Sequence, residues 1–323
     1  MGVMPDTSPL RRWALRGTIM LGAAGAASAA YQTAAEARDR WRFPPPGRLA
    51  DIGGRCLHFL DMGAGSPAVV IVPALGGNVL DLLGFYRELA GEGLRVVVYD
   101  RAGIGWSGPP GLGRRTHDVM ARELHDLLAA AGISPPYVLV GHSLGGIIAR
   151  RFAARYPMDV AGMVLIDSSH EDQVRRLHAE GWWSEPPVST VRHALKRGTR
   201  LLFLGLYRLS SREAFSDVPP ECADAARAVS LTARARRADL RELLLTLRPH
   251  GNPPDLGALP LTVLTAADRD ATWNAMQAEL ATISTESTHI VADYGGHFLQ
   301  RDNPALVSSA IRDLVKRIRE TTG

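Results

Sequence analysis

Short apolar runs alternate with segments of helical periodicity from about residue 48 to the C-terminus. Runs that stay apolar throughout are typical of strands buried on both faces, whereas the spacing of Met120, Leu124 and Leu127 is typical of an amphipathic helix. This alternation predicts an α/β fold, a mostly parallel sheet with helices on both faces. The buried strands are expected at residues 68–72, 95–99, 137–140, 162–166, 261–264 and 289–291.

Two further strands are expected before these six. Residues 49–52 and 56–60 are separated by Gly53 and Gly54, which favours an antiparallel hairpin at one edge of the sheet. The sequence therefore predicts an eight-stranded sheet.

The interval between the strands at residues 162–166 and 261–264 is too long for a simple loop, and residues 191–209 and 223–247 have helical periodicity. We therefore expect a helical lid at residues 169–257, inserted into a core formed by residues 48–168 and 258–323. Residues 175–248 carry fourteen basic side chains, against ten acidic ones counted from Glu171. Most of these charges predict a solvated face, although the excess also favours anionic groups on a ligand or surface.

The N-terminal region has the pattern of a targeting segment. Arg11, Arg12 and Arg16 precede an uncharged stretch at residues 17–35, and the prolines of residues 44–47 end the segment. An uncleaved membrane anchor and a signal peptide cleaved near Ala29 both fit, with the remainder of the chain outside the cytoplasm. An amphipathic cytosolic helix is the alternative.

The net charge of +4 belongs to this region, because residues 1–50 hold seven arginines and three acids. The remainder is balanced, so no nucleic-acid partner is expected. Hydrophobic residues make up 46% of the chain and charged residues 22%, which excludes a disordered or collagen-like chain. Cys56 and Cys222 have no Cys or His neighbours at ligand spacing, so neither a metal nor a cofactor is expected.

A candidate nucleophile lies at residues 141–145, which read Gly-His-Ser-Leu-Gly. The motif follows a buried strand and opens a helix, which is the setting of a nucleophile elbow, and it would place the Ser143 hydroxyl at the carboxyl edge of the sheet. A glycine-rich turn with Ser143 as a helix cap is the alternative.

A serine nucleophile needs a base, and His297 follows the last strand in a loop containing Gly295 and Gly296. An acid must orient that imidazole. Asp268 and Asp270 follow the strand at residues 261–264, and Asp167 ends the strand before it, which leaves three candidates.

The order Ser143, Asp268, His297 resembles that of the α/β-hydrolase superfamily, and the resemblance extends from about residue 48 to the end. The resemblance favours Asp268, because the family acid usually stands three residues beyond a glycine, a place taken here by Thr265. It also implies a structural role for Asp100. The segments at residues 44–47, 99–107, 141–146 and 167–173 resemble a narrower group of bacterial hydrolases, many with an N-terminal hydrophobic segment.

In this family the oxyanion hole is built from backbone N–H groups, which we assign to Leu75 and Leu144. The usual His-Gly after the third strand is replaced here by residues 73–77, Pro-Ala-Leu-Gly-Gly. Epoxide hydrolases and haloalkane dehalogenases carry aspartate at the elbow, so Ser143 argues against both.

These residues predict a serine hydrolase that cleaves an ester or related acyl bond through an acyl-serine intermediate. Perhydrolases, C–C hydrolases and some lyases share the triad, and a ligand sensor with little turnover is a further alternative. The substrate is expected to be a small molecule with a hydrophobic group. That expectation rests on aromatic residues in or near the lid: Trp106, Trp182, Trp183, Phe203 and Tyr207.

Overall fold

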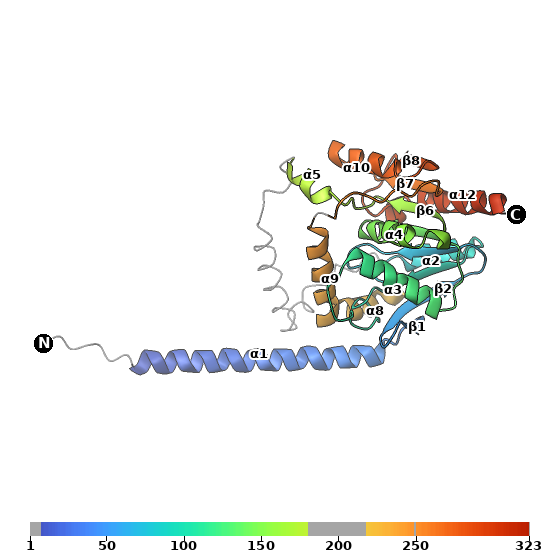
Figure 1. Ribbon diagram of the computed structural model, residues 1–323. Helices are drawn as coiled ribbons and strands as arrows, with labels where there is room; N and C mark the ends of the chain where they lie inside the picture. The colour runs from blue at the N-terminus through green and yellow to red at the C-terminus, as the bar shows by residue number, and fades with distance from the viewer. Residues whose placement is uncertain (1–7, 180–217, 249, 323) are drawn as a thin grey trace.

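The computed structural model describes residues 8–179, 218–248 and 250–322. Eight strands form one sheet in the order β1-β2-β4-β3-β5-β6-β7-β8 (Figure 1). The hairpin strands β1 and β2 are antiparallel to each other, β2 is antiparallel to β4, and every other pair is parallel. The predicted fold class is therefore confirmed. The strands are β1 (Arg48–Asp51), β2 (Cys56–Met62), β3 (Ala68–Val72), β4 (Val96–Tyr99), β5 (Tyr137–His142), β6 (Val160–Ile166), β7 (Leu261–Thr265) and β8 (Ser287–Val291).

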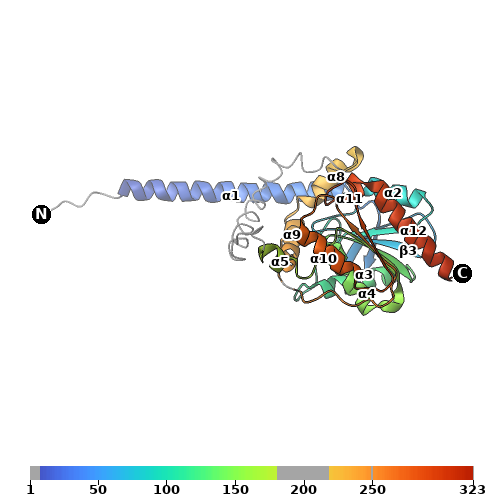
Figure 2. The same ribbon diagram turned by 90° about the horizontal axis from the view of Figure 1, so that it is seen from above.

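Helices cover both faces of the sheet, as Figure 2 shows for α2 and α12 on one side and α3 and α4 on the other. Successive side chains of β5 point to opposite layers: Leu139 packs with α3 and α4, whereas Val138 and Val140 pack with α2 and α12. This is why the strand is apolar throughout. The flanking helices are α2 (Leu83–Gly91), α3 (His117–Ala130), α4 (Leu144–Arg155), α10 (Ala271–Ala281), α11 (Leu299–Asp302) and α12 (Pro304–Thr322).

The described parts of the insertion between β6 and β7 combine three helices with loop residues, among them residues 250–260 before β7. The helices are α5 (Gln173–Ala179), α8 (Pro220–Ser230) and α9 (Ala233–Thr246). The helical periodicity at residues 223–247 corresponds to α8 and α9, while the predicted helix at residues 191–209 lies outside the described residues. Below, residues 169–257 are called the inserted segment.

A long N-terminal helix, α1 (Ser8–Arg42), extends away from the core (Figures 1 and 2). Its C-terminal half lies against the inserted segment: Gln32 Nε2 donates to the carbonyl of Leu231 at 3.0 Å, and Glu36 Oε1 accepts from the amide of Ala233 at 2.9 Å. These contacts place α1 at the joint between α8 and α9.

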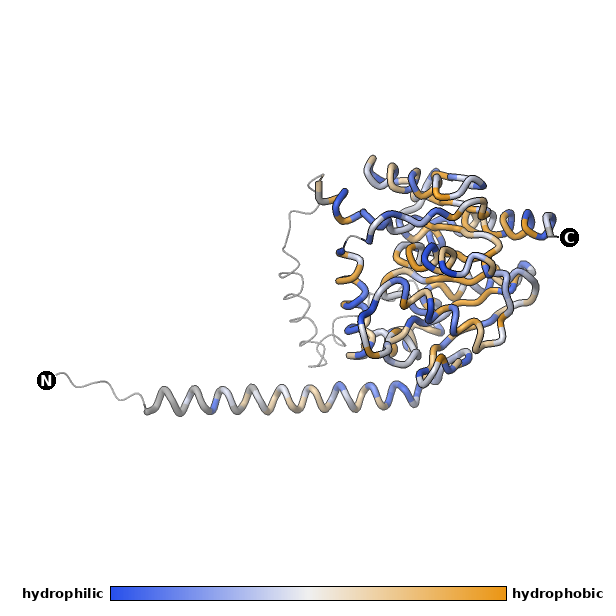
Figure 3. Tube along the Cα trace, in the orientation of Figure 1, coloured by the Kyte–Doolittle hydropathy of each residue, from blue (hydrophilic) through white to orange (hydrophobic). Residues whose placement is uncertain are grey.

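Hydropathy along α1 is mixed (Figure 3). Within the described ranges, no helix combines the length and the apolar character needed to cross a membrane. The predicted membrane anchor is therefore not supported, and the extracytoplasmic location stays a prediction.

Candidate active site

The predicted strand-turn-helix is present around Ser143. β5 ends at His142, α4 begins at Leu144, and Ser143 between them has φ 53° and ψ −122°. A non-glycine residue in the left-handed region is unusual and is often found at functional sites. The sharp turn that this conformation makes directs the Ser143 side chain out of the strand and above the edge of the sheet.

The glycines of the motif are required by close backbone packing. A Cβ atom on Gly141 would lie 2.7 Å from the Cα atom of Gly146, and one on Gly145 would lie 2.0 Å from the carbonyl oxygen of Val72. Both distances are far below van der Waals contact. The elbow therefore packs directly on its own helix and on β3.

Ser143 lines a small cavity of about 160 Å³ together with Leu75 and Leu144, the two residues assigned to the oxyanion hole. Leu75 comes from the loop after β3 and Leu144 from the first turn of α4. The inserted segment covers this cavity. It contributes side chains from α5 and α9, among them Val174, Leu177, Leu243 and Leu247.

The loop that carries Leu75 is held by a buried ion pair. Arg101 is 1% exposed, and its Nη1 and Nη2 atoms donate to the carbonyls of Pro73 and Ala74, each at 2.6 Å. The same guanidinium binds both carboxylate oxygens of Glu242 on α9, at 3.0 and 2.8 Å. Sequence reasoning missed both residues, although Arg101 lies within the segment at residues 99–107 that it had singled out.

His297 is paired with Asp167. Its Nδ1 atom lies 2.6 Å from Oδ2 of Asp167, which follows β6 directly, is fully buried, and has φ 39°. The other oxygen, Oδ1, accepts from the indole of Trp273 at 2.9 Å and from the amide of Ala266 at 3.2 Å. Burial alone would raise the pKa of Asp167, but hydrogen bonds from His297 and Arg269 outweigh it and lower that pKa to about 2. Asp167 is therefore a stable carboxylate.

The preference for Asp268 is corrected by this arrangement. Asp268 is exposed in the loop after β7, and Asp270 caps α10 by accepting from the amide of Trp273 at 2.8 Å. The amide of Ala267 donates to the carbonyl of Gly295 at 3.1 Å, and the loop then turns Asp268 to solvent while Arg269 faces inward. The carboxylate beside the imidazole is instead that of Asp167, which follows β6 and was the third candidate.

Arg269 lies against both members of the pair. Its Nη2 atom is 2.7 Å from Nδ1 of His297 and makes a short contact with Oδ2 of Asp167, and its guanidinium lies over the ring of Trp273 at 4.6 Å. A guanidinium only donates, whereas Nδ1 carries either a proton or a lone pair. With the proton on Nδ1, His297 donates to Asp167, and Arg269 interacts with the carboxylate alone.

His142 supports the loop of His297. Its Nε2 atom lies 2.7 Å from the carbonyl oxygen of His297, and the two rings are 4.8 Å apart. Burial lowers the pKa of His142 to about 3, so its ring is neutral and donates through Nε2. The side chain of His142 is therefore directed towards the loop that carries His297.

Ser143 and His297 lie at the same edge of the sheet, after β5 and β8 respectively, but no hydrogen bond joins them among the described residues. Contacts between nucleophile and base are often loose without substrate.

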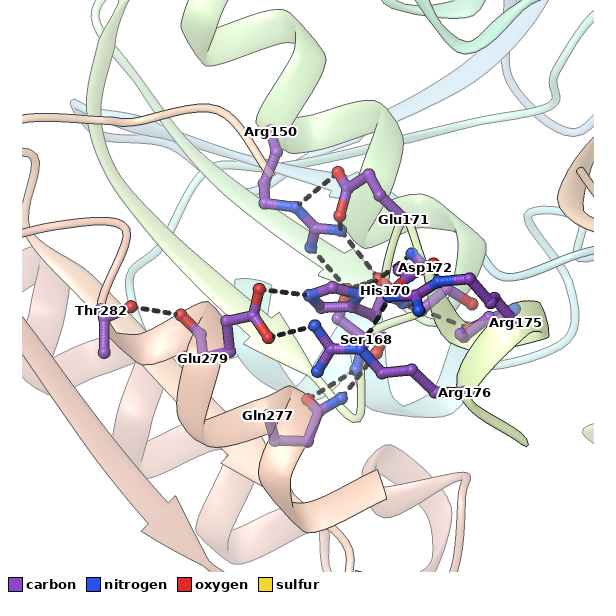
Figure 4. Close-up of polar contacts among 12 residues, drawn as sticks. Arg150, Ser168, His170, Glu171, Asp172, Arg175, Arg176, Gln277, Glu279 and Thr282 are labelled. Atoms are coloured by element: carbon purple, nitrogen blue, oxygen red, sulfur yellow. Dashed lines mark hydrogen bonds and ion pairs between the residues drawn. The ribbon is translucent and has the colours of Figure 1, made fainter. Parts of the chain in front are cut away.

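A buried polar network fixes the loop that carries Asp167 (Figure 4). Arg150 on α4 donates to Glu171 at 3.2 and 2.9 Å and to the hydroxyl of Ser168 at 2.8 Å. The side chain of Gln277 on α10 makes two hydrogen bonds with the backbone of Ser168. Its Oε1 atom accepts from the amide at 3.2 Å, and its Nε2 atom donates to the carbonyl at 2.7 Å. The loop is thereby tied to the helix that begins at the elbow, which explains the polar run at residues 167–173.

Two other sequence predictions concern ligands. Trp106 donates its indole N–H to the carbonyl of Phe43 at 2.9 Å, so it contacts the N-terminal linker, while Trp182, Trp183, Phe203 and Tyr207 lie outside the described residues. In the part of the chain that the structure describes, no group of three or more His, Cys, Asp or Glu residues is placed to hold a metal ion.

Comparison with known proteins identifies the family of this fold. Residues 67–304 match the family model described as the alpha/beta hydrolase fold. The chain belongs to the α/β-hydrolase family. It is therefore an enzyme of the hydrolase type acting on a small-molecule substrate.

Relatives of this α/β hydrolase include ester hydrolases. It is 27% identical to the uncharacterized protein YqjL of Bacillus subtilis over 226 residues, which cover 68% of this chain and 72% of that one. It is 33% identical to Lipase 1 of Psychrobacter immobilis over 106 residues, which cover 33% and 32%. A thermophilic esterase of Thermogutta terrifontis has a similar fold, with a TM-score of 0.56 at 24% identity over 82% of this chain and 94% of that one.

Proposed function

We propose that this hydrolase cleaves an ester or related acyl bond through an acyl-serine intermediate, with Ser143 as nucleophile, His297 as base and Asp167 as acid. The observation that carries the proposal is the Asp167–His297 pair, which lies at the same sheet edge as the strained Ser143 elbow. Relatives named as lipase and esterase support acyl chemistry.

In this mechanism the Ser143 hydroxyl attacks the substrate carbonyl while Nε2 of His297 takes its proton. The carboxylate of Asp167 holds the proton on Nδ1 and stabilises the imidazolium that forms. The negative oxygen of the tetrahedral intermediate accepts hydrogen bonds from the amides of Leu75 and Leu144. His297 then protonates the leaving group, and water hydrolyses the acyl-serine by the same steps.

The shape of the site favours a substrate with a hydrophobic group. The cavity at Ser143 is lined mainly by aliphatic side chains, including Val174, Leu177 and Leu243. A second cavity of about 400 Å³ lies beyond Leu75 and is bordered by His142 and Phe298. Together the two cavities offer room for an acyl group and an alcohol on opposite sides of Leu75.

We further propose that the inserted segment acts as a lid. Both α5 and α9 border the Ser143 cavity, so the substrate must pass them or displace them. The core would then comprise residues 48–168 and 258–323, as the sequence predicts.

Active-site labelling with a fluorophosphonate tests the nucleophile. Wild-type protein should be labelled on Ser143, and Ser143→Ala should lose the label together with most turnover of p-nitrophenyl esters. The matched control is Ser169→Ala, because Ser169 lines the same cavity. Equal labelling of wild type and Ser143→Ala would refute the assignment. Labelling of Ser143 without turnover of esters, amides or peroxy substrates would favour the sensor alternative.

A further inference from the structure

A separate cleft of about 770 Å³, here called the arginine cleft, lies on the face of α9 opposite to the Ser143 cavity. Arg241, Leu244, Leu245 and Arg248 line this cleft, whereas Leu243, Thr246 and Leu247 line the Ser143 cavity. The other walls of the cleft are α3, the loop at residues 110–115 and the turn between β1 and β2. No lining residue is shared, so the inference does not depend on the proposed chemistry.

The cleft is strongly basic. Among the residues that the structure describes, it is lined by six arginines and by two acids, Glu123 and Asp126. The arginines are Arg55, Arg114, Arg115, Arg122, Arg241 and Arg248.

Two of the three acids near the cleft are already engaged. Glu123 accepts from Arg55 at 2.6 Å and makes a short ion pair with Arg115. Glu242, just behind the wall, is occupied by Arg101. Asp126, whose side chain is 54% exposed, is the described acid that offsets the remaining arginines, so positive charge stays in excess.

Four guanidinium groups are unpaired. Within the described part of the chain, no hydrogen bond or ion pair reaches the side chains of Arg114, Arg122, Arg241 or Arg248. They come from the 110–115 loop, α3, α9 and the turn that follows α9, and line one cleft. Like charges brought together without counter-charge repel, and a bound anion relieves that repulsion.

Arg115 adds a buried donor at the wall. Its side chain is 10% exposed, and Nη2 has no hydrogen-bond partner, its nearest acid being Glu242 Oε1 at 3.9 Å. An unsatisfied buried donor is costly unless a ligand or water accepts from it. Arg115 therefore adds a further cation at the wall of the cleft, with one N–H group that the two neighbouring acids leave without a hydrogen bond.

We propose that this cleft binds a small ligand bearing two or more phosphate groups. Phosphate oxygens match the planar fork of arginine, and several guanidiniums around one cleft favour more than one phosphate. Gly113 lies at the rim with φ 117°, and no atom lies within 4 Å of the place of its missing Cβ, so a ligand can approach the backbone. The cleft volume is within the range of small-molecule sites. Either a free phosphorylated compound or a lipid headgroup supplies this chemistry.

Titration calorimetry with inorganic pyrophosphate on the full chain tests the site. We expect binding at low salt that weakens as salt is added, because the contacts are electrostatic. The double variant Arg122→Gln/Arg241→Gln should weaken binding at least about tenfold, as expected for loss of two charge-assisted contacts. The control Lys316→Gln/Arg317→Gln removes the same charge from exposed positions on α12 and should change binding less than about twofold.

A vesicle assay distinguishes the two sources of phosphate. Cosedimentation compares phosphatidylcholine vesicles with and without cardiolipin, whose headgroup carries two phosphates. Cleft-dependent binding to cardiolipin vesicles but not to pyrophosphate would identify a headgroup, and the reverse a free ligand. Binding of neither probe, or equal weakening in the cleft and control variants, would overturn the proposal.

Arginine modification provides a measurement that needs no variant. Phenylglyoxal followed by mass spectrometry should show that pyrophosphate protects Arg114, Arg122, Arg241 and Arg248 in the wild-type chain, while Arg317 stays reactive. Unchanged reactivity at all four positions under saturating probe would equally refute the site.

Discussion

The carboxylate of Asp167 lies 2.6 Å from Nδ1 of His297, although the two residues are 130 positions apart in the sequence. The pair joins the end of β6 to the loop after β8, two strands that are not adjacent, since β7 lies between them. The aspartate therefore reaches across the end of β7 to orient the imidazole.

The first prediction separates the candidate acids. Asp167→Asn should lower kcat by about 1,000- to 10,000-fold, because an amide no longer holds the proton on Nδ1 or stabilises the imidazolium. Asp268→Asn, the matched control in the exposed loop, should stay within about twofold of wild type. Steady-state kinetics with a p-nitrophenyl ester measures both. Loss of activity in Asp268→Asn but not in Asp167→Asn would show that Asp268 is the acid, as the family resemblance implies.

The second prediction concerns stability in acid. The pKa of Asp167 falls from an ordinary 3.8 to about 2 in the folded chain, so its stabilising effect is complete above about pH 4 and is lost as the pH falls towards 2. A shift of this size corresponds to about 2 kcal/mol. Denaturant unfolding at about pH 6 and pH 2.5 should therefore show a smaller acid-induced loss in Asp167→Asn than in wild type. Equal losses would indicate that the carboxylate is not stabilised by folding.

The third prediction concerns Arg269, a positioning residue for the pair. Removing the cation with Arg269→Met should lower kcat by about tenfold with little change in KM, because the carboxylate of Asp167 would lose a charged donor that fixes its position beside Nδ1 of His297. Arg269→Lys keeps the charge and should restore most of kcat. A purely structural role would lower thermal stability together with kcat, and lysine would not rescue it.

The fourth prediction concerns the elbow. Gly145→Ala places a methyl group 2.0 Å from the carbonyl oxygen of Val72, so the elbow or β3 must shift. We expect a loss of stability of about 3 kcal/mol and loss of most activity. Gly84→Ala, in α2 where no atom lies within 4 Å of the added carbon, is the control and should stay within about 1 kcal/mol. Comparable thermal unfolding of the two variants would contradict the packing argument.

The positions of the strands and of the elbow at Ser143 could be predicted because each depends on a short, contiguous stretch of sequence. Buried strands need apolar side chains on both faces, and the turn at Ser143 needs glycine where other backbone segments of the same chain approach closely. Even so, β5 and β7 extend beyond the expected ends, since polar His142 and Thr265 interrupt the apolar runs.

The acid was harder to predict because its choice depends on where two loops turn. The distance from Thr265 favoured Asp268, but the loop after β7 directs Arg269 inward, and that guanidinium needs a carboxylate neighbour. The Arg101–Glu242 pair was missed for a similar reason. Its members are 141 positions apart, and no periodicity in the sequence links them.

The contact between α1 and the joint of α8 and α9 has a practical consequence for preparing this enzyme. Removing residues 1–43 would delete Gln32 and Glu36, which brace helices bordering both the Ser143 cavity and the arginine cleft. Processing near Ala29 would instead leave both side chains in place. Any shortened protein used for kinetics should therefore begin no later than about residue 30, because one that begins at residue 44 lacks both contacts with the joint between α8 and α9.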